Sequence, residues 1–268
     1  MKTSPISSPI SWSLVVAANS EKVLQGNLLG TGEVESATDV CVIWGARSSS
    51  SAYNYGLART RGEVVVFAHQ DVFLPKGWAL RLNQCLKELT ANDPQWGVAG
   101  IFGVSASGEG IGYTYSTGLG RYVGKPFRAP TPVRTLDEII LIIRRSSGLF
   151  FDEKLPGFHL YGADICLEAE SRGMRNYAIP CFAFHNSCGV KWLPPDFWRA
   201  YMYLRRKWWD RLPIITSCTK ITKSCAPMFH HFLERSWITI KGKNKPGVRL
   251  EDPTRFYEEH IKLTAGRS

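Results

Sequence analysis

The stretch FAHQDVFLP, at residues 67–75, places three polar side chains directly after a run of hydrophobic β-formers. His69, Gln70 and Asp71 follow VVVF, at the point where a buried strand is predicted to end. A carboxylate at a strand end can bind a divalent cation through a hard oxygen. Asp71 can also cap the turn before the following proline, and His69 can bond a backbone group, so both interpretations stay open here.

Two further polar residues stand at predicted element ends. Asp164 precedes a predicted helix at 165–172, where it can cap the helix or act as a general base. His185 follows a predicted strand at 177–184, and its neutral imidazole can be a second metal ligand. One Asp and one His are enough for a magnesium or manganese site if a diphosphate supplies the other oxygens.

The hydrophobic pattern indicates the elements that must position these residues. Apolar runs predict strands at 13–18, 39–44, 63–67 and 96–104, and helical patterns lie between them. Such alternation predicts an α/β fold with a mostly parallel sheet covered by helices. Ligands of such sheets bind outside the carboxyl ends of the strands, where Asn19 and Gly45 also fall. Residues 105–132, rich in Gly, Ser and Tyr, predict a lid over that edge.

Composition excludes several classes of protein. The 268 residues are 44% hydrophobic and 21% charged, which is typical of a folded globular protein. No apolar run has the length of a membrane span, and the N-terminus lacks a signal-peptide core, so we expect a cytoplasmic protein. Seven scattered cysteines without a CxxC pair indicate reduced thiols. A zinc site from Cys181, His185 and Cys188 is an alternative, although its spacing matches no usual zinc module.

The net charge of +10 is concentrated in one part of the chain. Residues 190–268 carry sixteen Lys or Arg against seven Asp or Glu, hence +9 of the total. We therefore predict a body at 1–189 and a basic, Trp- and Arg-rich, largely helical extension at 190–268. The extension can pack on the body, contact an anionic membrane surface, or hold an anionic or lipid-linked acceptor. Nucleic-acid binding is a further alternative, but no nucleic-acid-binding motif supports it.

The motifs together resemble a known family. HQDV-x-LP-x-GW, FHLYG-x-D-x-CL and FHNS are similar to nucleotide-sugar glycosyltransferases of the GT-A type. The resemblance is to the branch related to family 2 whose members carry HQDV in place of an Asp-x-Asp motif, and it covers about residues 13–187. It implies a GT-A fold and a nucleotide-sugar donor. It also implies a divalent cation (Mn²⁺ or Mg²⁺), a glycan, lipid-linked or protein acceptor, and a role in glycan biosynthesis.

The resemblance also implies roles for individual residues. Asp71 would bind the metal on the donor diphosphate, and His185 would be the late metal-ligating histidine. Asp164 would be the catalytic base of an inverting transfer. The implied donor-side residues are Asn19, Asn54, Arg59, His69, Gln70 and Asp71, and the candidates on the acceptor side are His159, Tyr161 and Trp78.

The sequence departs from the family pattern at three places. His69 replaces the first acid of Asp-x-Asp, and Ala163 replaces the Glu before the expected base. The second strand ends in Trp44-Gly45, without the Asp that relatives use to read the base. We therefore expect a weaker dependence on metal, and a GT-A fold that binds a glycan or nucleotide without catalysis stays an alternative.

Overall fold

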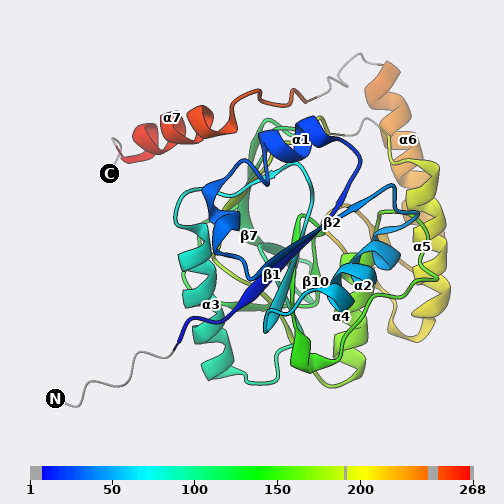
Figure 1. The fold of residues 1–268 in the computed structure, drawn as a ribbon. Helices are drawn as coiled ribbons and strands as arrows, with labels where there is room; N and C mark the ends of the chain where they lie inside the picture. The colour runs from blue at the N-terminus through cyan, green and yellow to red at the C-terminus, as the bar shows by residue number, and fades with distance from the viewer. Residues whose placement is uncertain (1–7, 190–191, 241–246, 266–268) are drawn as a thin grey trace.

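The structure is a computed structural model that describes residues 8–189, 192–240 and 247–265. A seven-stranded sheet forms its centre (Figure 1), in the order β2-β1-β3-β11-β5-β12-β9. Its strands are β1 (Trp12–Ala18), β2 (Asp39–Trp44), β3 (Val64–Ala68), β5 (Val98–Gly100), β9 (Thr131–Val133), β11 (Ile140–Arg144) and β12 (Asn176–Ala178). The sheet is mixed, because β11 and β9 run against the other strands. The other five strands share one direction, so the expectation of a mostly parallel sheet is confirmed, with β11 and β9 as the antiparallel exceptions.

A second sheet lies next to the first, in the order β10-β6-β7-β13-β4, with β8 paired to β7. Its strands are β4 (Val72–Phe73), β6 (Phe102–Val104), β7 (Gly110–Ser116), β8 (Arg121–Gly124), β10 (Thr135–Leu136) and β13 (Ala183–His185). The segment at 105–132, predicted as a lid, contains the antiparallel pair β7–β8 and the start of the edge strand β9, so it is built into both sheets. Its role as a lid stays a prediction. A small hairpin joins β14 (Ile214–Ile215) to β15 (Lys220–Ile221).

The helices cover both faces of the central sheet. They are α1 (Glu21–Gly26), α2 (Ser49–Arg59), α3 (Trp78–Asn92), α4 (Tyr161–Ser171), α5 (Pro195–Lys207), α6 (Ala226–Ile240) and α7 (Pro253–Ala265), with 3-10 turns η1 (Gly32–Ser36), η2 (Arg145–Ser147) and η3 (Trp209–Arg211). Figure 1 shows α3 on one side of β1, and α2, α4 and α5 on the other. None of the described helices is long and apolar enough to cross a membrane.

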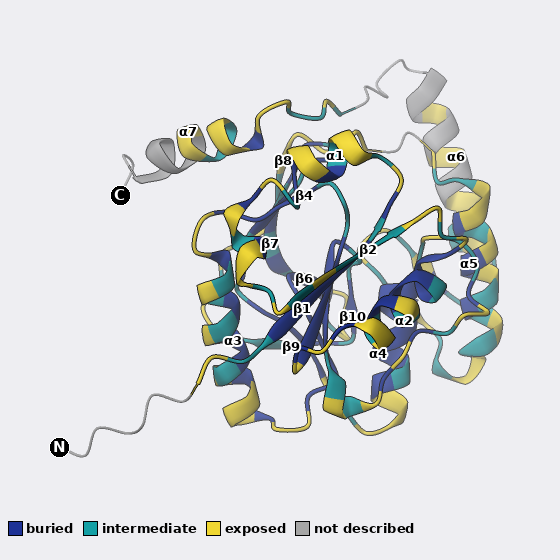
Figure 2. Ribbon diagram, in the orientation of Figure 1, coloured by how far each residue is buried: buried dark blue, intermediate teal, exposed yellow. Residues whose placement is uncertain are grey.

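Alternating side chains of the central strands fill two separate cores. Leu14 and Val66 pack with α3 on one face, whereas Val15 and Val65 pack with α2, α4 and α5 on the other. This follows from the period of two along a strand. β1, β3 and β11 are almost wholly buried, whereas β2 at the sheet edge is partly exposed, and Figure 2 shows β1 in the colour of buried residues.

The first helix of the basic extension belongs to the second of these cores. Phe197, Tyr201 and Leu204 recur at helical spacing along α5 and are buried there. A proline at the first helical position, Pro195, starts the helix. The division at residue 189 stays a prediction, but α5 packs as part of the body, which is one of the arrangements the sequence left open.

Candidate functional site

The carboxyl ends of β1, β2 and β3 surround a cavity of about 340 Å³. This is the edge at which an α/β sheet is expected to bind a ligand. The strand ends contribute Ala17, Ala18, Asn19, Gly45, Ala46, His69, Gln70 and Asp71, and the opposite wall is Tyr53, Phe158 and Tyr161. We call this cavity the strand-end pocket. The structure thus brings together His69, Gln70 and Asp71 with Asn19, as the sequence predicted.

Gln70 and Asn19 fix the floor of the strand-end pocket. The Gln70 side-chain oxygen accepts hydrogen bonds from the backbone N–H groups of Asn19 (3.0 Å) and Ser20 (3.1 Å), and its amide donates to Asn19 Oδ1 (2.6 Å). These bonds tie the loop after β1 to the end of β3. Gln70 therefore holds the shape of the pocket, while Asn19 lines it from the first loop.

His69, Asp71 and His185 form a group that could hold a metal ion. One potential ligand atom from each lies within 4.8 Å of the others. Asp71 Oδ1 is 3.4 Å from His185 Nε2, because β13 pairs with β4 and delivers His185 opposite Val72. A carboxylate with two imidazoles fits a first-row transition ion such as Mn²⁺ better than Mg²⁺, which prefers oxygen ligands. Among the described residues, the group contains neither Cys181 nor Cys188, so the zinc alternative is not supported.

The electrostatics of the group favour a charged Asp71 carboxylate beside a neutral His69 ring. Burial opposes ionisation of Asp71, but the hydrogen bond from His185 and the charges of His185, His69 and Arg249 hold its pKa well below the ordinary value. Burial and the nearby His185 lower the pKa of His69 to about 4, so its ring is neutral near pH 7. Burial also opposes protonation of His185, yet Asp71 raises the pKa of that ring above the ordinary value.

Tyr161 supports the group from beneath. Its hydroxyl lies 2.9 Å from His69 Nε2 and donates to the backbone carbonyl of Glu138 at 3.2 Å. The Tyr161 ring is 1% exposed and packs edge-on against Tyr53. Tyr161 therefore orients His69. It also lines the strand-end pocket, where its predicted acceptor-side role stays a prediction.

Comparison with known proteins places the chain in a family. A family model described as "Glycosyltransferase like family" matches residues 32–188, which is more than half of the chain. The chain belongs to this glycosyltransferase-like family. The matched span contains His69, Asp71 and His185, and it ends before α5. The glycosyltransferase resemblance seen in the motifs is therefore confirmed.

A curated relative and solved structures extend the comparison. A Fuscovulum blasticum protein described as "ATP synthase subunits region ORF 6" is 35% identical over 136 residues, which cover 48% of this chain and 53% of the relative. The match thus spans about half of that protein. The structure of GalNAc-T7 with UDP, GalNAc and Mn²⁺ has a TM-score of 0.55 and 12% identity over 76% of this chain and 49% of that one. The mannosyltransferase PcManGT from Pyrobaculum calidifontis, in complex with GDP-Man and Mn²⁺, has a TM-score of 0.43 and 14% identity over 67% and 57% of the two chains. At such identity the first match shows the fold, which is GT-A.

The glycosyltransferase-like chain does not bring Asp164 to the strand-end pocket. Asp164 is 2% exposed and lines a different cavity of about 520 Å³, with Glu168 of α4, Lys207 of α5, Asn54 of α2 and residues 150–154. We call it the Asp164 pocket. Lys207 Nζ donates to one carboxylate oxygen (2.9 Å) and Trp208 Nε1 to the other (2.7 Å). The role of Asp164 as base stays a prediction that this arrangement does not support.

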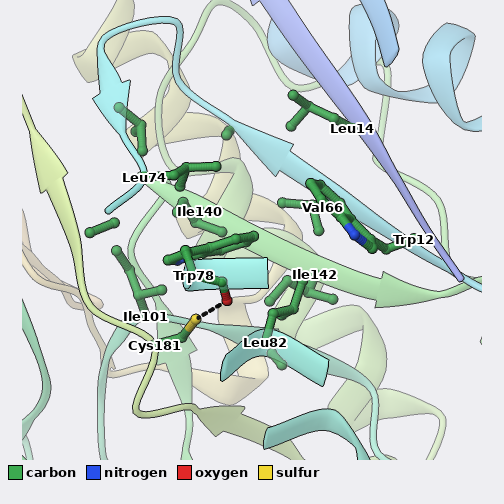
Figure 3. Packing of buried hydrophobic residues seen from close by; sticks show 14 of the residues in the cluster. Trp12, Leu14, Val66, Leu74, Trp78, Leu82, Ile101, Ile140, Ile142 and Cys181 are labelled. Atoms are coloured by element: carbon green, nitrogen blue, oxygen red, sulfur yellow. Dashed lines mark hydrogen bonds between the residues drawn. The ribbon is translucent and has the colours of Figure 1, made fainter. Parts of the chain in front are cut away.

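Three other predicted residues lie away from the strand-end pocket. Trp78 is 3% exposed and packs in the core against Trp12, as Figure 3 shows, so it cannot meet an acceptor there. Asn54 exchanges two 2.8 Å hydrogen bonds with the backbone of Phe151 and lines the Asp164 pocket. Arg59 ends α2 and its guanidinium stacks on the Tyr55 ring at 3.4 Å. The burial of Trp78 corrects the expectation of an acceptor contact for it. The donor-side roles of Asn54 and Arg59 stay predictions that their positions do not support.

His159 lies next to the strand-end pocket and contacts α5. It is half-buried and packs edge-on against Phe197 of α5, and burial lowers its pKa. Its neighbours Phe158 and Tyr161 line the strand-end pocket. His159 therefore stays a candidate for the acceptor side.

Two residues of the site carried no clear signal in the sequence. Asn186 is fully buried, and Arg249 Nη2 reaches Asp71 Oδ2 at 3.1 Å from 178 residues along the chain. Asn186 belongs to the FHNS motif, so the resemblance could have marked it. Arg249 lies outside the span that the family matches, and no local pattern distinguishes it from other arginines of the basic extension.

Proposed function

We propose that this protein transfers a sugar from a nucleoside-diphosphate sugar to an acceptor hydroxyl, with a divalent cation bound by Asp71, His185 and His69. The observation that carries the proposal is the grouping of these three side chains at the strand-end pocket of a glycosyltransferase-like chain. GalNAc-T7 was solved with UDP and Mn²⁺, and PcManGT with GDP-Man and Mn²⁺. The ligands bound to GalNAc-T7, whose fold this chain shares, favour a nucleotide-sugar donor for this chain, and the two histidines favour Mn²⁺ over Mg²⁺.

The proposed chemistry divides between the cation and the protein. When bound, the cation neutralises the charge that develops on the leaving nucleoside diphosphate. Asp71 and His185 would hold it, while Tyr161 fixes the His69 ring through the 2.9 Å contact. Gln70 and Asn19 keep the pocket floor in place for the donor. Preorganised groups of this kind act without reorganisation at the moment of reaction.

The acceptor side of the proposal rests on fewer contacts. An inverting transfer needs a base on the face of the sugar opposite the leaving group, and Asp164 is the residue predicted for it. Asp164 can take this role only after Lys207 and Trp208 release its carboxylate. The acceptor is proposed as a hydroxyl of a glycan, a lipid-linked sugar or a protein.

A binding protein without transfer is the second candidate function. The ion pair of Asp164 with Lys207 favours it, since it leaves the predicted base buried and occupied. Release of nucleoside diphosphate from nucleotide sugars by the purified protein distinguishes the two. Metal-dependent release supports the transferase, whereas nucleotide binding without release supports the binding protein.

Ligand-induced thermal stabilisation tests the donor site without knowledge of the acceptor. The melting temperature is measured with UDP, GDP, CMP and dTDP, with and without Mn²⁺, on wild type, Asp71→Asn and Asp196→Asn. A ligand that binds only the folded state raises this temperature by mass action. We expect one nucleotide to act in a Mn²⁺-dependent manner on wild type and on the surface control Asp196→Asn, but not on Asp71→Asn. Equal stabilisation of Asp71→Asn, or none of wild type, would refute the proposed donor site.

We also propose that the outer face of α5 and α6 contacts an anionic membrane surface. Arg199, Arg206 and Lys154 line a hollow of about 640 Å³ together with Met202 and Trp209, which are both about two-fifths exposed. On α6, exposed Phe229, Leu233 and Trp237 recur every four residues and so lie on one stripe. Cationic and aromatic side chains beside exposed aliphatic ones suit the interface of an anionic bilayer.

Vesicle flotation tests the membrane contact. Wild type should float with phosphatidylglycerol vesicles and not with phosphatidylcholine vesicles, and high salt should reduce the floating fraction. Phe229→Ser/Leu233→Ser should lose flotation, while Leu80→Ser, which changes an equally exposed leucine on α3, should not. Flotation unchanged in the α6 double variant would contradict the proposal.

A further inference from the structure

The chain beyond the family-matched span returns to the strand-end pocket. Residues 247–257, which we call the C-terminal strap, are held by the buried side chain of Asn186. The Asn186 side chain accepts from the backbone N–H of Leu250 (2.7 Å) and donates to the Leu250 carbonyl (2.9 Å). Phe256 and Tyr257 pack against Phe184 of β13, with ring centroids 5.8 and 5.4 Å away. The strap is therefore fastened at both ends to the strand that carries His185.

This fastening places Arg249 beside the predicted metal ligand. Arg249 Nε donates to the Asn186 carbonyl at 2.8 Å, and its Nη2 donates to Asp71 Oδ2 at 3.1 Å. The other oxygen of Asp71 faces His185, so Arg249 does not occupy the side on which the metal group converges. A guanidinium has five N–H donors, and these two bonds leave others for a ligand. The Arg249 side chain is 32% exposed, whereas the Asp71 side chain is 13% exposed, so part of Arg249 stays accessible to a ligand.

The charges around Asp71 suit Arg249 to the binding of an anionic ligand. A motif with two acids would offer a metal two carboxylates, but here His69 stands at the first position, and an imidazole has no fixed negative charge to offer. Arg249 pairs with Asp71 through Nη2 alone, so its other N–H groups bring donors and positive charge to the edge of the pocket. The forked guanidinium matches phosphate oxygens in geometry as well as in charge.

We propose that Arg249 binds the diphosphate of the donor, and that the C-terminal strap is part of the donor site. This rests on the proposed function, because it names the residue that holds the same nucleotide. Arg249 supplies part of the charge neutralisation that the metal would otherwise supply alone. The binding site then extends past residue 188, where the family match ends.

Calorimetric titration of the full-length chain tests the role of Arg249. The ligands are the nucleoside diphosphate that stabilises wild type most, and its nucleoside, each in Mn²⁺ and in EDTA. Arg249→Ala should raise the Kd for the diphosphate about 10- to 100-fold in both conditions, since a charged hydrogen-bonding partner is lost. Arg249→Lys should recover part of the affinity. The Kd for the nucleoside, which has no phosphate, should not change.

Arg255→Ala is the matched control, because Arg255 lies on the same strap but pairs with Glu259 at the surface. It should bind both ligands as wild type does. An unchanged diphosphate Kd in Arg249→Ala, with or without tighter Mn²⁺ binding, would overturn the proposal and leave Arg249 as a competitor of the metal. An equal loss for diphosphate and nucleoside would also overturn it, as a structural effect. If wild type binds no nucleoside diphosphate, the proposed function fails first and the role of Arg249 fails with it.

Discussion

The strand-end pocket and the Asp164 pocket each contain an acid that the sequence marked as functional, paired with a cation from the basic extension. Asp71 meets Arg249 at 3.1 Å, and Asp164 meets Lys207 at 2.9 Å. The surroundings separate them. Asp71 lines a cavity at the strand ends with two histidines close by, whereas both oxygens of Asp164 are bonded under α5. Asp71 thus lines a cavity despite its ion pair with Arg249. Asp164 has hydrogen bonds to both of its carboxylate oxygens.

The pKa directions express the same difference. The neighbouring His185, His69 and Arg249 outweigh burial and lower the pKa of Asp71. For Asp164, burial raises the pKa and Lys207 offsets this only in part. Asp71 is therefore a ready anion for a metal, while Asp164 depends on Lys207 for its charged form. We therefore expect substitutions in the strand-end pocket to change ligand binding and substitutions in the Asp164 pocket to change stability.

Removal of the charge on Asp71 should have the largest effect. Asp71→Asn should weaken Mn²⁺-dependent nucleotide binding at least about 100-fold, because a metal-bound diphosphate interaction is worth several kcal/mol. The thermal midpoint of the ligand-free protein should also fall, because the neutral amide no longer pairs with Arg249 and His185. Calorimetry with and without EDTA measures the effect. If the variant still binds the nucleotide tightly and only with Mn²⁺, Asp71 is not the ligand that holds the cation.

Removal of the cation in the Asp164 pocket should affect stability instead. Lys207→Met leaves Asp164 and Asp152 without their shared partner, which is 2.8 Å from Asp152. Breaking a buried ion pair on one side costs about 3 kcal/mol of unfolding free energy. Urea denaturation of this variant and of Lys207→Met/Asp164→Asn checks this, and the double variant should recover part of the loss. A strong fall in nucleotide affinity without loss of stability would place Lys207 in the donor site.

Loss of the Tyr161 hydroxyl sharpens the account of the metal group. Tyr161→Phe removes the partner of His69 Nε2 and should lower Mn²⁺ affinity about tenfold, as outer partners of metal ligands do. Tyr203→Phe is a control, since Tyr203 OH bonds Asp152 in the Asp164 pocket. Equal Mn²⁺ affinity in Tyr161→Phe and wild type would contradict the proposed orienting role.

Substitution of Asn54 should have the smallest effect, and it tests whether Asn54 contacts the donor. Asn54→Ala removes the pair of hydrogen bonds to Phe151 and should cost about 1–2 kcal/mol of stability. Nucleotide affinity should stay that of wild type, because Asn54 does not line the strand-end pocket. A selective loss of nucleotide affinity would restore its predicted donor role.

The local sequence pattern was sufficient to predict the acid and the histidines at the strand ends. It was insufficient to predict the cations that pair with the two acids. His69 and Asp71 were predictable because a buried apolar run must end at the sheet edge, and His185 because a second strand ends there too. Trp78 was misassigned because a tryptophan after Gly77 fits both a ligand contact and a helix buried in the core. Arg249 and Lys207 could not be predicted, since their positions depend on how the basic extension folds back over the body.

Anomalous scattering at the manganese edge, from crystals grown with Mn²⁺ and the stabilising nucleoside diphosphate, tests the central assignment most directly. We expect a single strong peak about 2.0–2.3 Å from the ligand atoms of Asp71 and His185. A peak among Asp152, Asp164 and Glu168, with Asp71 still paired to Arg249, would contradict it and move the chemistry to the Asp164 pocket.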